Sequence, residues 1–328
     1  IIDRYNVQNY PDIAKTFNNS GITPIYGVEL EKLPAIIPAV LNPIDTSLNS
    51  CEYVVFDLET TGLHPIFDDI IEFGAVIVKN NQIIAKEQFF IKPNCQLSTK
   101  ISNLTNIYET NLENAIDQKS GLEKIVNFIG DRVLVAHNGI NFDFNFINIK
   151  LIQYGFSPLK NCLIDSMVIS RAINEYKAHN LEMLAKKLHL NYNADEAHRA
   201  DYDAQLLAEV WMQFLQILSQ WECKTIAEIN PKIQTDRLRQ STRGDFVVVY
   251  AKNQQGIKNI YELVSKSHSI GFFNRPTITW DDILMFRDNL ITTNLAIESD
   301  VINLAIDGSD LELEECISKY DFISLCSS

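Results

Sequence analysis

Two carboxylates, Asp57 and Glu59, stand one residue apart inside the segment VVFDLETTG, residues 54–62, which otherwise has the composition of a buried β-strand. Side chains alternate between the two faces of a strand, so both carboxylates share one face while Phe56 and Leu58 point to the other. Two negative charges this close repel each other unless a cation or a hydrogen-bond donor compensates them. A lone D-x-E pattern is commonly a turn-capping Asp beside a solvated Glu, so a metal site requires further ligands elsewhere in the chain.

The composition limits the class of protein. The chain has 328 residues, of which 46% are hydrophobic, and this is long enough for two domains because single cores seldom grow past about 250 residues. The formal net charge of -14 argues against a surface that coats nucleic acid, but not against an acidic, metal-filled cleft that binds a strand end. The six cysteines include no C-x-x-C pair, which predicts neither a zinc knuckle nor a disulfide scaffold and favours a cytoplasmic setting. No apolar run approaches the roughly 20 residues of a membrane span, and no membrane partner is expected.

The hydrophobic periodicity predicts an α/β protein with at least two units. Residues 1–48 have the pattern of a strand, a helix and a second strand, followed by a proline-containing linker. The next segment, residues 49–219, predicts a meander of three antiparallel strands, two further short strands that each lead into a helix, and a long closing helix. Residues 220–328 predict a second αβ unit. The N-terminal residue is not methionine, and we expect the chain to be part of a longer protein.

Two more carboxylates lie on the apolar stripes of predicted helices. Asp143 shares a stripe with Phe146, three residues further on, in a helix expected to begin near Gly139. Near the closing helix, Asp201 and Asp203 compete, and the apolar spacing favours Asp203 as the carboxylate that faces the sheet. Taken alone, Asp143 could equally be a first-turn residue favoured by the helix dipole.

The constellation as a whole indicates metal-dependent hydrolysis. Four carboxylates at strand and helix ends can hold two divalent ions that activate water during phosphodiester hydrolysis. Ligands that offer only oxygen point to Mg²⁺ or Mn²⁺ rather than zinc. His198 precedes the closing helix, and a single histidine at such a position would more commonly be an ordinary surface residue than a catalytic one.

The segments FDLETTG, HNGINFDFNF and HRADYDA resemble, in this order, the three motifs of the DnaQ-like exonuclease superfamily, in its branch marked by Asp, Glu, Asp, Asp and His. The resemblance covers about residues 50–219 and implies an RNase H-like fold with a mixed central sheet. It also implies metal-ligating carboxylates and a histidine, His198, as general base for the attacking water. The implied ligands are Asp57, Glu59, Asp143 and Asp203.

The same resemblance implies substrate contacts. Thr60, Thr61 and Leu63 match positions that hold the terminal nucleoside in the family, and Asn138 matches a supporting residue near the site. Asp165 matches a family aspartate too, but we interpret it as the N-cap of the following helix rather than as a metal ligand.

The segments on either side of the exonuclease resemble two halves of a polymerase-and-histidinol-phosphatase (PHP) domain, and therefore an incomplete PHP (βα)-barrel-like domain interrupted by the exonuclease. This arrangement is similar to that of Gram-positive-type PolC replicative DNA polymerase III alpha subunits. It implies a polymerase beyond residue 328, DNA with a single-stranded or frayed primer 3′ end as substrate, and other replisome subunits such as the sliding clamp as partners.

The PHP resemblance has departures at expected ligand positions. Arg4 replaces a family histidine after Asp3, Phe246 replaces another, and Ala296 lies where the family has a cysteine, whereas Glu29 is retained. Neither a guanidinium nor a phenyl ring offers a lone pair to a metal. We therefore predict a PHP scaffold without metal catalysis.

Three functions are consistent with these patterns. The first is a 3′-to-5′ DNA exonuclease that proofreads for the polymerase, and the second is an RNA-trimming relative with the same residues. The third is a non-catalytic module that positions a polymerase. The flanking segments favour DNA over RNA, and the intact set of five site residues favours catalysis over a purely structural role.

Overall fold

The computed structural model describes residues 2–173, 178–194, 197–296, 299–307 and 310–325. The chain forms two compact units, and each is described separately below. Unit 1 combines residues up to Ile37 with residues from Thr235 on, and unit 2 comprises Pro38–Gln234. Unit 2 is therefore longer at both ends than the predicted segment 49–219. The PHP and exonuclease names of the predicted domains stay predictions at this point.

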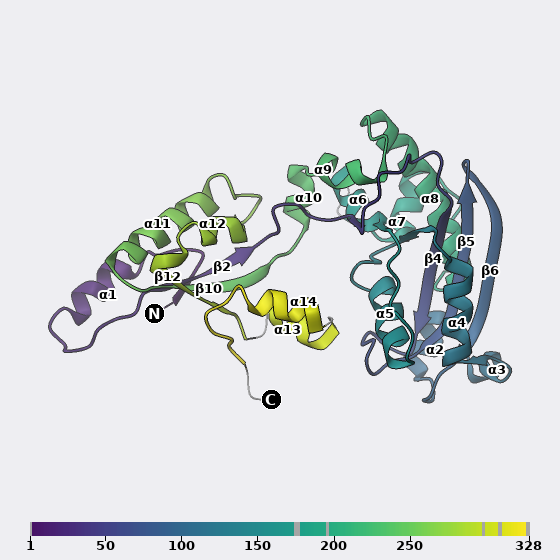
Figure 1. Cartoon of the computed structure of the whole chain (residues 1–328), viewed down its shortest axis with the longest axis horizontal. Coiled ribbons are helices and arrows are strands. Elements are labelled where there is room, and N and C mark those ends of the chain that lie inside the picture. Colours follow the sequence, from purple (N-terminus) through teal and green to yellow (C-terminus); the bar gives the residue numbers. More distant parts are fainter. Residues whose placement is uncertain (1, 174–177, 195–196, 297–298, 308–309, 326–328) are drawn as a thin grey trace. The chain divides into compact units, whose positions relative to one another are not determined.

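Unit 2 is built on a seven-stranded mixed sheet with the order β3-β9-β8-β4-β5-β6-β7. Strands β4, β5 and β6 form the predicted antiparallel meander (Figure 1). Strand β8 pairs parallel with β4, and β9 pairs parallel with β8. The strands are β3 (Val40–Leu41), β4 (Tyr53–Thr60), β5 (Ile70–Lys79), β6 (Gln82–Lys92), β7 (Ile116–Asp117), β8 (Val133–Ala136) and β9 (Leu163–Asp165). The predicted mixed α/β sheet is confirmed.

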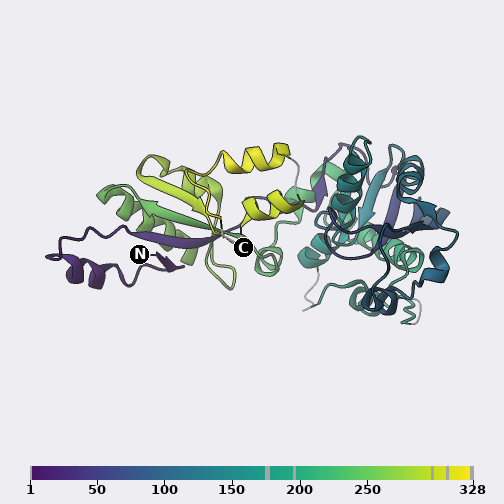
Figure 2. The ribbon, with the colours of Figure 1, turned by 90° about the horizontal axis from the view of Figure 1, so that it is seen from below.

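Helices cover both faces of this sheet, as Figure 2 shows. Phe56 and Leu58 of β4 belong to a core shared with α4 and α5, as the strand alternation predicts. On the other face, Tyr53 packs edge-on against Trp211 of α8, with ring centroids 5.2 Å apart. The helices are α2 (Thr99–Thr105), α3 (Glu109–Leu112), α4 (Gln118–Ile129), α5 (Asp143–Gln153), α6 (Ser166–Ile173), α7 (Leu181–Lys187), α8 (Ala200–Gln220), η1 (Ile226–Glu228) and α9 (Ile229–Lys232).

The segment predicted as a linker before the exonuclease is partly ordered within unit 2. β3 adds an edge strand to the sheet by pairing antiparallel with β9. The side chain of Asn230 accepts hydrogen bonds from the amides of Ala39 and Val40, each at 2.9 Å, and donates one to the carbonyl of Val40 at 2.8 Å. The prolines of this stretch suggested a flexible connection, but an amide side chain from about 190 residues further on satisfies its backbone and fixes it.

Unit 1 contains a five-stranded sheet in which β1 (Ile2–Arg4), β2 (Gly27–Lys32), β10 (Asp245–Ala251) and β12 (Leu290–Asn294) are neighbours in that order, and β11 (Thr277–Ile278) also pairs with β2. The central pair joins the two ends of the chain, because β2 lies antiparallel to β10. The helices are α1 (Tyr10–Phe17), α10 (Asp236–Ser241), α11 (Gln254–His268), α12 (Trp280–Leu284), η2 (Arg287–Asn289), α13 (Asp300–Asp307) and α14 (Asp310–Ile317). Segments 1–37 and 235–325 thus build one unit, although unit 2 separates them in the sequence.

The described cysteines are free thiols, in agreement with the predicted absence of a disulfide scaffold. They are Cys51, Cys95, Cys162, Cys223 and Cys316. Within the described ranges, no helix has both the length and the apolar character needed to cross a membrane.

Candidate active site

Three of the predicted carboxylates meet at the end of β4. Asp57 and Glu59 come from β4 and Asp203 from the first turn of α8, and one oxygen of each lies within 4.8 Å of the others. The period of two in a β-strand explains why Asp57 and Glu59 lie on the same face. The spacing of apolar residues in α8 explains why Asp203 faces them. Asp201, its rival in the sequence, is not a member of this group.

A glycine on β5 allows α8 to approach the sheet at this point. Gly74 pairs with Asp57 across the two strands. A Cβ atom on Gly74 would lie only 2.1 Å from the carbonyl carbon of Ala200, the first residue of α8. Any side chain there would push the helix away, so the missing Cβ of Gly74 permits the meeting of Asp203 with Asp57.

Asp143, the fourth predicted carboxylate, lies beside the group rather than in it. It begins α5, its side chain is only 2% exposed, and its Oδ1 accepts a hydrogen bond of 3.2 Å from the amide of Leu58. The apolar residues that follow it on its stripe are buried, as predicted. Because Leu58 stands between Asp57 and Glu59, this bond holds the start of α5 against the strand that carries both.

Burial and mutual repulsion make these carboxyl groups weak acids. Burial raises the pKa of Glu59 to about 9, with the neighbouring charges of Asp203 and Glu72 adding to the effect. Burial raises the pKa of Asp143 to about 7 and that of Asp203 to about 6. The pKa of Asp57 is raised well above its ordinary 3.8 by burial and then by Asp143 and Glu59. The arrangement is therefore costly without a cation, and a bound cation would relieve the cost.

The donor set fits a hard divalent cation. The grouped side chains offer only carboxylate oxygens, which suit Mg²⁺ or Mn²⁺ better than zinc. Asp57, Glu59 and Asp203 are close enough to share an ion. Asp143 lies beside them, hydrogen-bonded to the amide of Leu58.

The predicted nucleoside-contacting residues lie at the end of β4 and in the loop of residues 61–69. Thr60 is buried and its hydroxyl donates to the carbonyl of Gly62 at 2.6 Å. Thr61 closes the loop, because its amide donates to the carbonyl of Asp69 and its hydroxyl accepts from the amide of Asp69, both at 2.9 Å. Leu63, in contrast, is 77% exposed. The hydrogen-bonded loop of residues 61–69 thus exposes the side chain of Leu63 next to β4, the strand that carries Asp57 and Glu59.

A buried ion pair anchors this loop to α5. Lys150 Nζ lies 3.2 Å from Asp69 Oδ1, and both side chains are almost completely buried. Because α5 also carries Asp143, the loop and the fourth carboxylate are fixed to the same helix.

The turn before α5 differs from the expectation. We expected the helix to begin near Gly139, but it begins at Asp143. Asn138 has a left-handed backbone with φ 68°, and the carboxylate of Asp165 accepts from the amides of Asn138 at 3.1 Å and Ile140 at 3.2 Å. These bonds hold residues 138–142 as a turn and delay the helix. Asp165 also accepts from the amide of Met167 at 2.9 Å, so its predicted capping role for α6 is confirmed.

His198 lies two residues before the start of α8, exposed and in a left-handed conformation with φ 62°. Its amide donates to Asp203 Oδ2 at 3.1 Å. The predicted general base is therefore attached through its backbone to one of the grouped carboxylates.

Sequence reasoning missed Glu72 and Arg199. Glu72 lies on β5 directly opposite Glu59, is fully buried, and binds the Arg199 guanidinium through both carboxylate oxygens. A charged residue inside the otherwise apolar strand IIEFGAVIV was the available signal, because such a residue is rarely buried without a partner.

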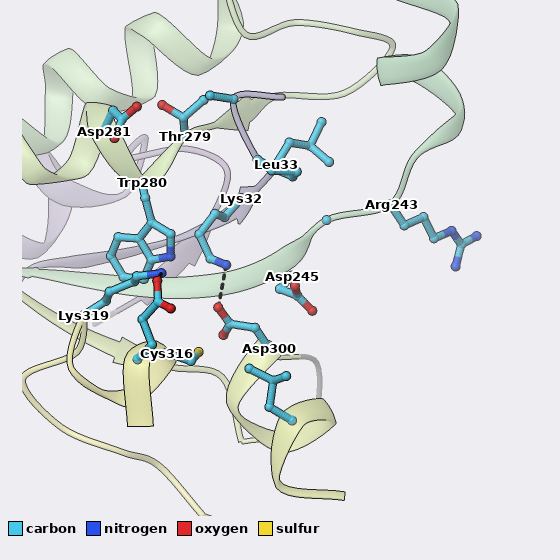
Figure 3. Close-up of a pocket in the computed structure, with 15 residues that line it drawn as sticks. Lys32, Leu33, Arg243, Asp245, Thr279, Trp280, Asp281, Asp300, Cys316 and Lys319 are labelled. Carbon is cyan, nitrogen blue, oxygen red and sulfur yellow. Dashed lines mark hydrogen bonds and ion pairs between the residues drawn. The ribbon is translucent and has the colours of Figure 1, made fainter. Parts of the chain in front are cut away.

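Unit 1 contains a separate pocket of about 560 Å³ (Figure 3). Lys32 and Asp300 point toward each other in it, and Lys32 Nζ lies 2.7 Å from Asp300 Oδ2. Lys32 also lies 5.4 Å from the ring centroid of Trp280, and the Tyr320 hydroxyl donates to Asp300 Oδ1 at 2.6 Å. This largely buried pair connects the end of β2 with the start of α13, and the two charges compensate each other within unit 1.

Comparison with known proteins was made for the whole chain. Residues 54–211, which include Asp57, Glu59 and Asp203, match the family model described as Exonuclease. Over its full length the chain is homologous to part of the PolC-type DNA polymerase III. It is 48% identical to that protein from Ureaplasma parvum over 100% of the chain, 36% to that from Mycoplasma genitalium over 98%, and 33% to that from Staphylococcus aureus over 99%. The chain spans only 23%, 22% and 22% of these relatives' own lengths. The predicted resemblance to exonucleases and to PolC polymerases is confirmed.

Among solved structures, the chain is similar to Escherichia coli exonuclease I in complex with a dA16 oligonucleotide, at a TM-score of 0.47 and 19% identity, covering 53% of this chain and 42% of that one. It is also similar to a 3′-exonuclease that recognises the histone mRNA stem-loop, at a TM-score of 0.46 and 20% identity, covering 53% and 84%.

The raised carboxyl pKa values predict that the metal-free site loses stability as the pH rises. In the folded chain these groups keep protons that unfolded Asp and Glu lose near 3.8 and 4.5. Their contribution is therefore fully present below about pH 4 and is lost as the pH rises through about 6 to about 9. In EDTA, thermal unfolding at pH 5, 7 and 9 should show a falling Tm, and Mg²⁺ or Mn²⁺ should reduce the fall.

The double variant Asp57→Asn, Glu59→Gln removes two of these titrating groups and should flatten the dependence of Tm on pH. Glu123→Gln, on the exposed face of α4, is the control and should follow the wild-type curve. A double variant with the wild-type dependence would contradict this electrostatic account.

Proposed function

We propose that this chain provides the proofreading 3′-to-5′ exonuclease of a DNA polymerase III alpha subunit, and that it removes 3′-terminal nucleotides from DNA with two Mg²⁺ or Mn²⁺ ions. The observation that carries the proposal is the convergence of Asp57, Glu59 and Asp203 within 4.8 Å, with His198 bonded through its amide to Asp203. The polymerase activity itself would belong to the rest of the full-length protein.

Each site residue has a separate role in this proposal. Asp57, Glu59, Asp143 and Asp203 would hold the ions, which, when bound, would activate the attacking water and stabilise the leaving oxygen. His198 would accept the proton of that water at an imidazole nitrogen. The water oxygen forms a new bond to phosphorus, and the bond from phosphorus to the 3′ oxygen of the preceding nucleotide breaks. The products are a nucleoside 5′-monophosphate and a strand whose new 3′ oxygen takes a proton from solvent.

The residues near the loop 61–69 would hold the terminal nucleotide. Thr60 and Thr61 would contact it through a backbone that their own hydroxyl bonds keep rigid, and Asn138 would support it from the turn before α5. Leu63 would pack against the terminal base, since an exposed apolar side chain gains by covering a nucleobase. A mispaired end is cheaper to separate than a paired one, and such a site therefore selects mismatches.

We propose further that unit 1 is an incomplete PHP domain that acts as a scaffold without a catalytic metal. Arg4 is ion-paired with Glu29, the retained family position, and its guanidinium lies 4.5 Å from the ring centroid of Phe246. Glu31 on the same strand is bound by Arg275, with Nε at 2.7 Å from Oε1. Guanidinium groups therefore already compensate both Glu29 and its neighbour Glu31 on β2.

DNA rather than RNA is the proposed substrate because the named relatives are DNA polymerases over the whole chain, including unit 1. The remaining polymerase domains and replisome subunits such as the sliding clamp are the proposed partners. The motifs themselves are also compatible with an exoribonuclease, and the first experiment separates the two.

Asp57→Ala combined with Glu59→Ala should abolish exonuclease activity while the chain stays folded, because two of the cation ligands are lost. Primer-templates with matched and mismatched 3′ ends, together with short RNA, would be incubated with Mg²⁺, Mn²⁺ or EDTA. The wild type should degrade DNA only with a metal, and faster at the mismatch. Preference for RNA would support the exoribonuclease instead, and a folded, metal-loaded wild type without activity would leave only a scaffold.

His198→Ala should lower kcat roughly 10²- to 10⁴-fold, the range typical of a lost general base. Metal binding should persist, because the bond from residue 198 to Asp203 comes from the backbone. Single-turnover cleavage of a labelled oligonucleotide and Mn²⁺ titration by paramagnetic resonance would measure the two effects. His189→Ala, in the turn after α7, is the matched control and should retain wild-type kcat. Wild-type kcat in the folded His198 variant would refute the assigned role.

The variant Asp57→Ala, Glu59→Ala also tests the scaffold proposal for unit 1. With the exonuclease site disabled, the chain should retain far less than one equivalent of Mn²⁺ or Zn²⁺ after gel filtration, as measured by plasma mass spectrometry. The Arg4→Ala change in the same background would remove the ion pair with Glu29 and would show whether the arginine excludes metal. One or more tightly bound ions with Arg4 intact would overturn the scaffold proposal.

A further inference from the structure

Glu72 is a buried carboxylate whose two oxygens are both occupied by donors. Its Oε2 accepts from Arg199 Nε and from the amide of Ala200, each at 3.1 Å. Its Oε1 accepts from Arg199 Nη2 at 2.8 Å and from Gln88 Nε2 at 2.6 Å. Although Glu72 lies opposite Glu59 in the sheet, it is not a member of the carboxylate group that could hold a cation. Its role therefore differs from that of Glu59.

These bonds replace a missing helix cap. Arg199 is the N-cap residue of α8, and its side chain does not accept from the first turn. The amide of Ala200, which the helix itself leaves without an acceptor, is satisfied by Glu72 from the sheet. Arg199 also lies 5.3 Å from the ring centroid of Phe90 on β6. The start of α8 is thus bound to two neighbouring strands.

The segment fixed in this way carries two groups of the proposed reaction. His198 is adjacent to Arg199. The hydrogen bond from the His198 amide to the Asp203 carboxylate spans the first turn of α8. The amide of Asp203 in turn donates to the carbonyl of Arg199 at 2.9 Å. Any shift of Arg199 therefore moves both His198 and Asp203 relative to Asp57 on β4.

We propose that the Glu72–Arg199 ion pair is a positioning device that holds His198 and Asp203 in place against Asp57 and Glu59. The pair touches neither substrate nor cation and acts through the first turn of α8. Its guanidinium also compensates Glu72, so that this carboxylate does not bind the cation in place of Glu59. This role rests on the proposed exonuclease function.

Arg199→Lys is the decisive variant, because lysine keeps the charge but cannot make the paired, planar contact with both oxygens of Glu72. We expect kcat on a single-stranded oligonucleotide to fall roughly 10- to 100-fold, as small displacements of catalytic groups do, with KM changed less than about twofold. Amide hydrogen exchange should become faster in residues 198–203 and stay unchanged in β4. In Arg199→Ala, added guanidinium should restore part of the lost kcat.

Arg132→Lys is the matched control. Arg132 Nε lies 2.9 Å from Glu52 Oε2, in a more exposed arginine–glutamate pair of the same unit. Glu52 precedes β4 and so lies at the end of that strand away from Glu59. This variant should keep wild-type kcat and wild-type exchange in residues 198–203. Glu72→Gln, which keeps the shape of the side chain, should show the same loss of kcat as Arg199→Lys.

Three results would overturn the proposal: wild-type kcat in folded Arg199→Lys, unchanged exchange in residues 198–203, or a loss of kcat that parallels a loss of Tm and is not restored by guanidinium. The third result would indicate that the Glu72–Arg199 pair only stabilises the fold and does not position His198 and Asp203. The exchange measurement needs no activity. An inactive wild type would therefore count against the proposed exonuclease function, while the exchange data would still decide whether the pair fixes the segment.

Discussion

Repulsion among buried carboxylates is the constraint that shapes unit 2. Asp57, Glu59 and Asp203 are brought within 4.8 Å although burial and mutual charge raise their pKa values, and such a group destabilises a fold that holds no cation. The rest of the unit keeps them together. β4 is a central strand of the sheet, and α8 packs on one of its faces. The Leu58 amide of β4 donates a hydrogen bond to Asp143 at the start of α5. Burial and repulsion oppose the ionisation of these groups, and a bound divalent cation would remove that opposition.

The carboxylate group at the end of β4 in unit 2 and the carboxylates of β2 in unit 1 are compensated in different ways. In unit 1, Glu29 and Glu31 of β2 are each paired with an arginine, and Lys32 of the same strand is paired with Asp300. In unit 2, the only cation that contacts a carboxylate next to the group, among the described residues, is Arg199, and it binds Glu72 instead of the grouped side chains. Charges balanced within the protein favour a stable scaffold, whereas charges left unbalanced are available to a ligand. This contrast is a physical reason to assign chemistry to unit 2 and support to unit 1.

The sequence predicted most of the site because local periodicity determines it. The period of two in β4 placed Asp57 with Glu59, and the apolar stripe of α8 separated Asp203 from Asp201. The capping role of Asp165 also follows from local spacing. The start of α5 was predicted four residues early, because the turn at Asn138 is held by a carboxylate 27 residues away. No local pattern contains such a bond.

The same distinction explains why Glu72 and Arg199 escaped sequence reasoning. Their contact depends on the register of β4 with β5 and on the close approach of Ala200 to Gly74, which join segments about 127 residues apart. Residue types alone suggest only that a buried Glu needs a partner. Once the register is known, the consequence is specific: β5, which pairs with the strand that carries Asp57 and Glu59, also holds the helix that brings Asp203 to them. The positions of the carboxylates then depend on β4, β5 and α8 together. A change in the contact between any two of these elements should affect the contacts that each makes with the third.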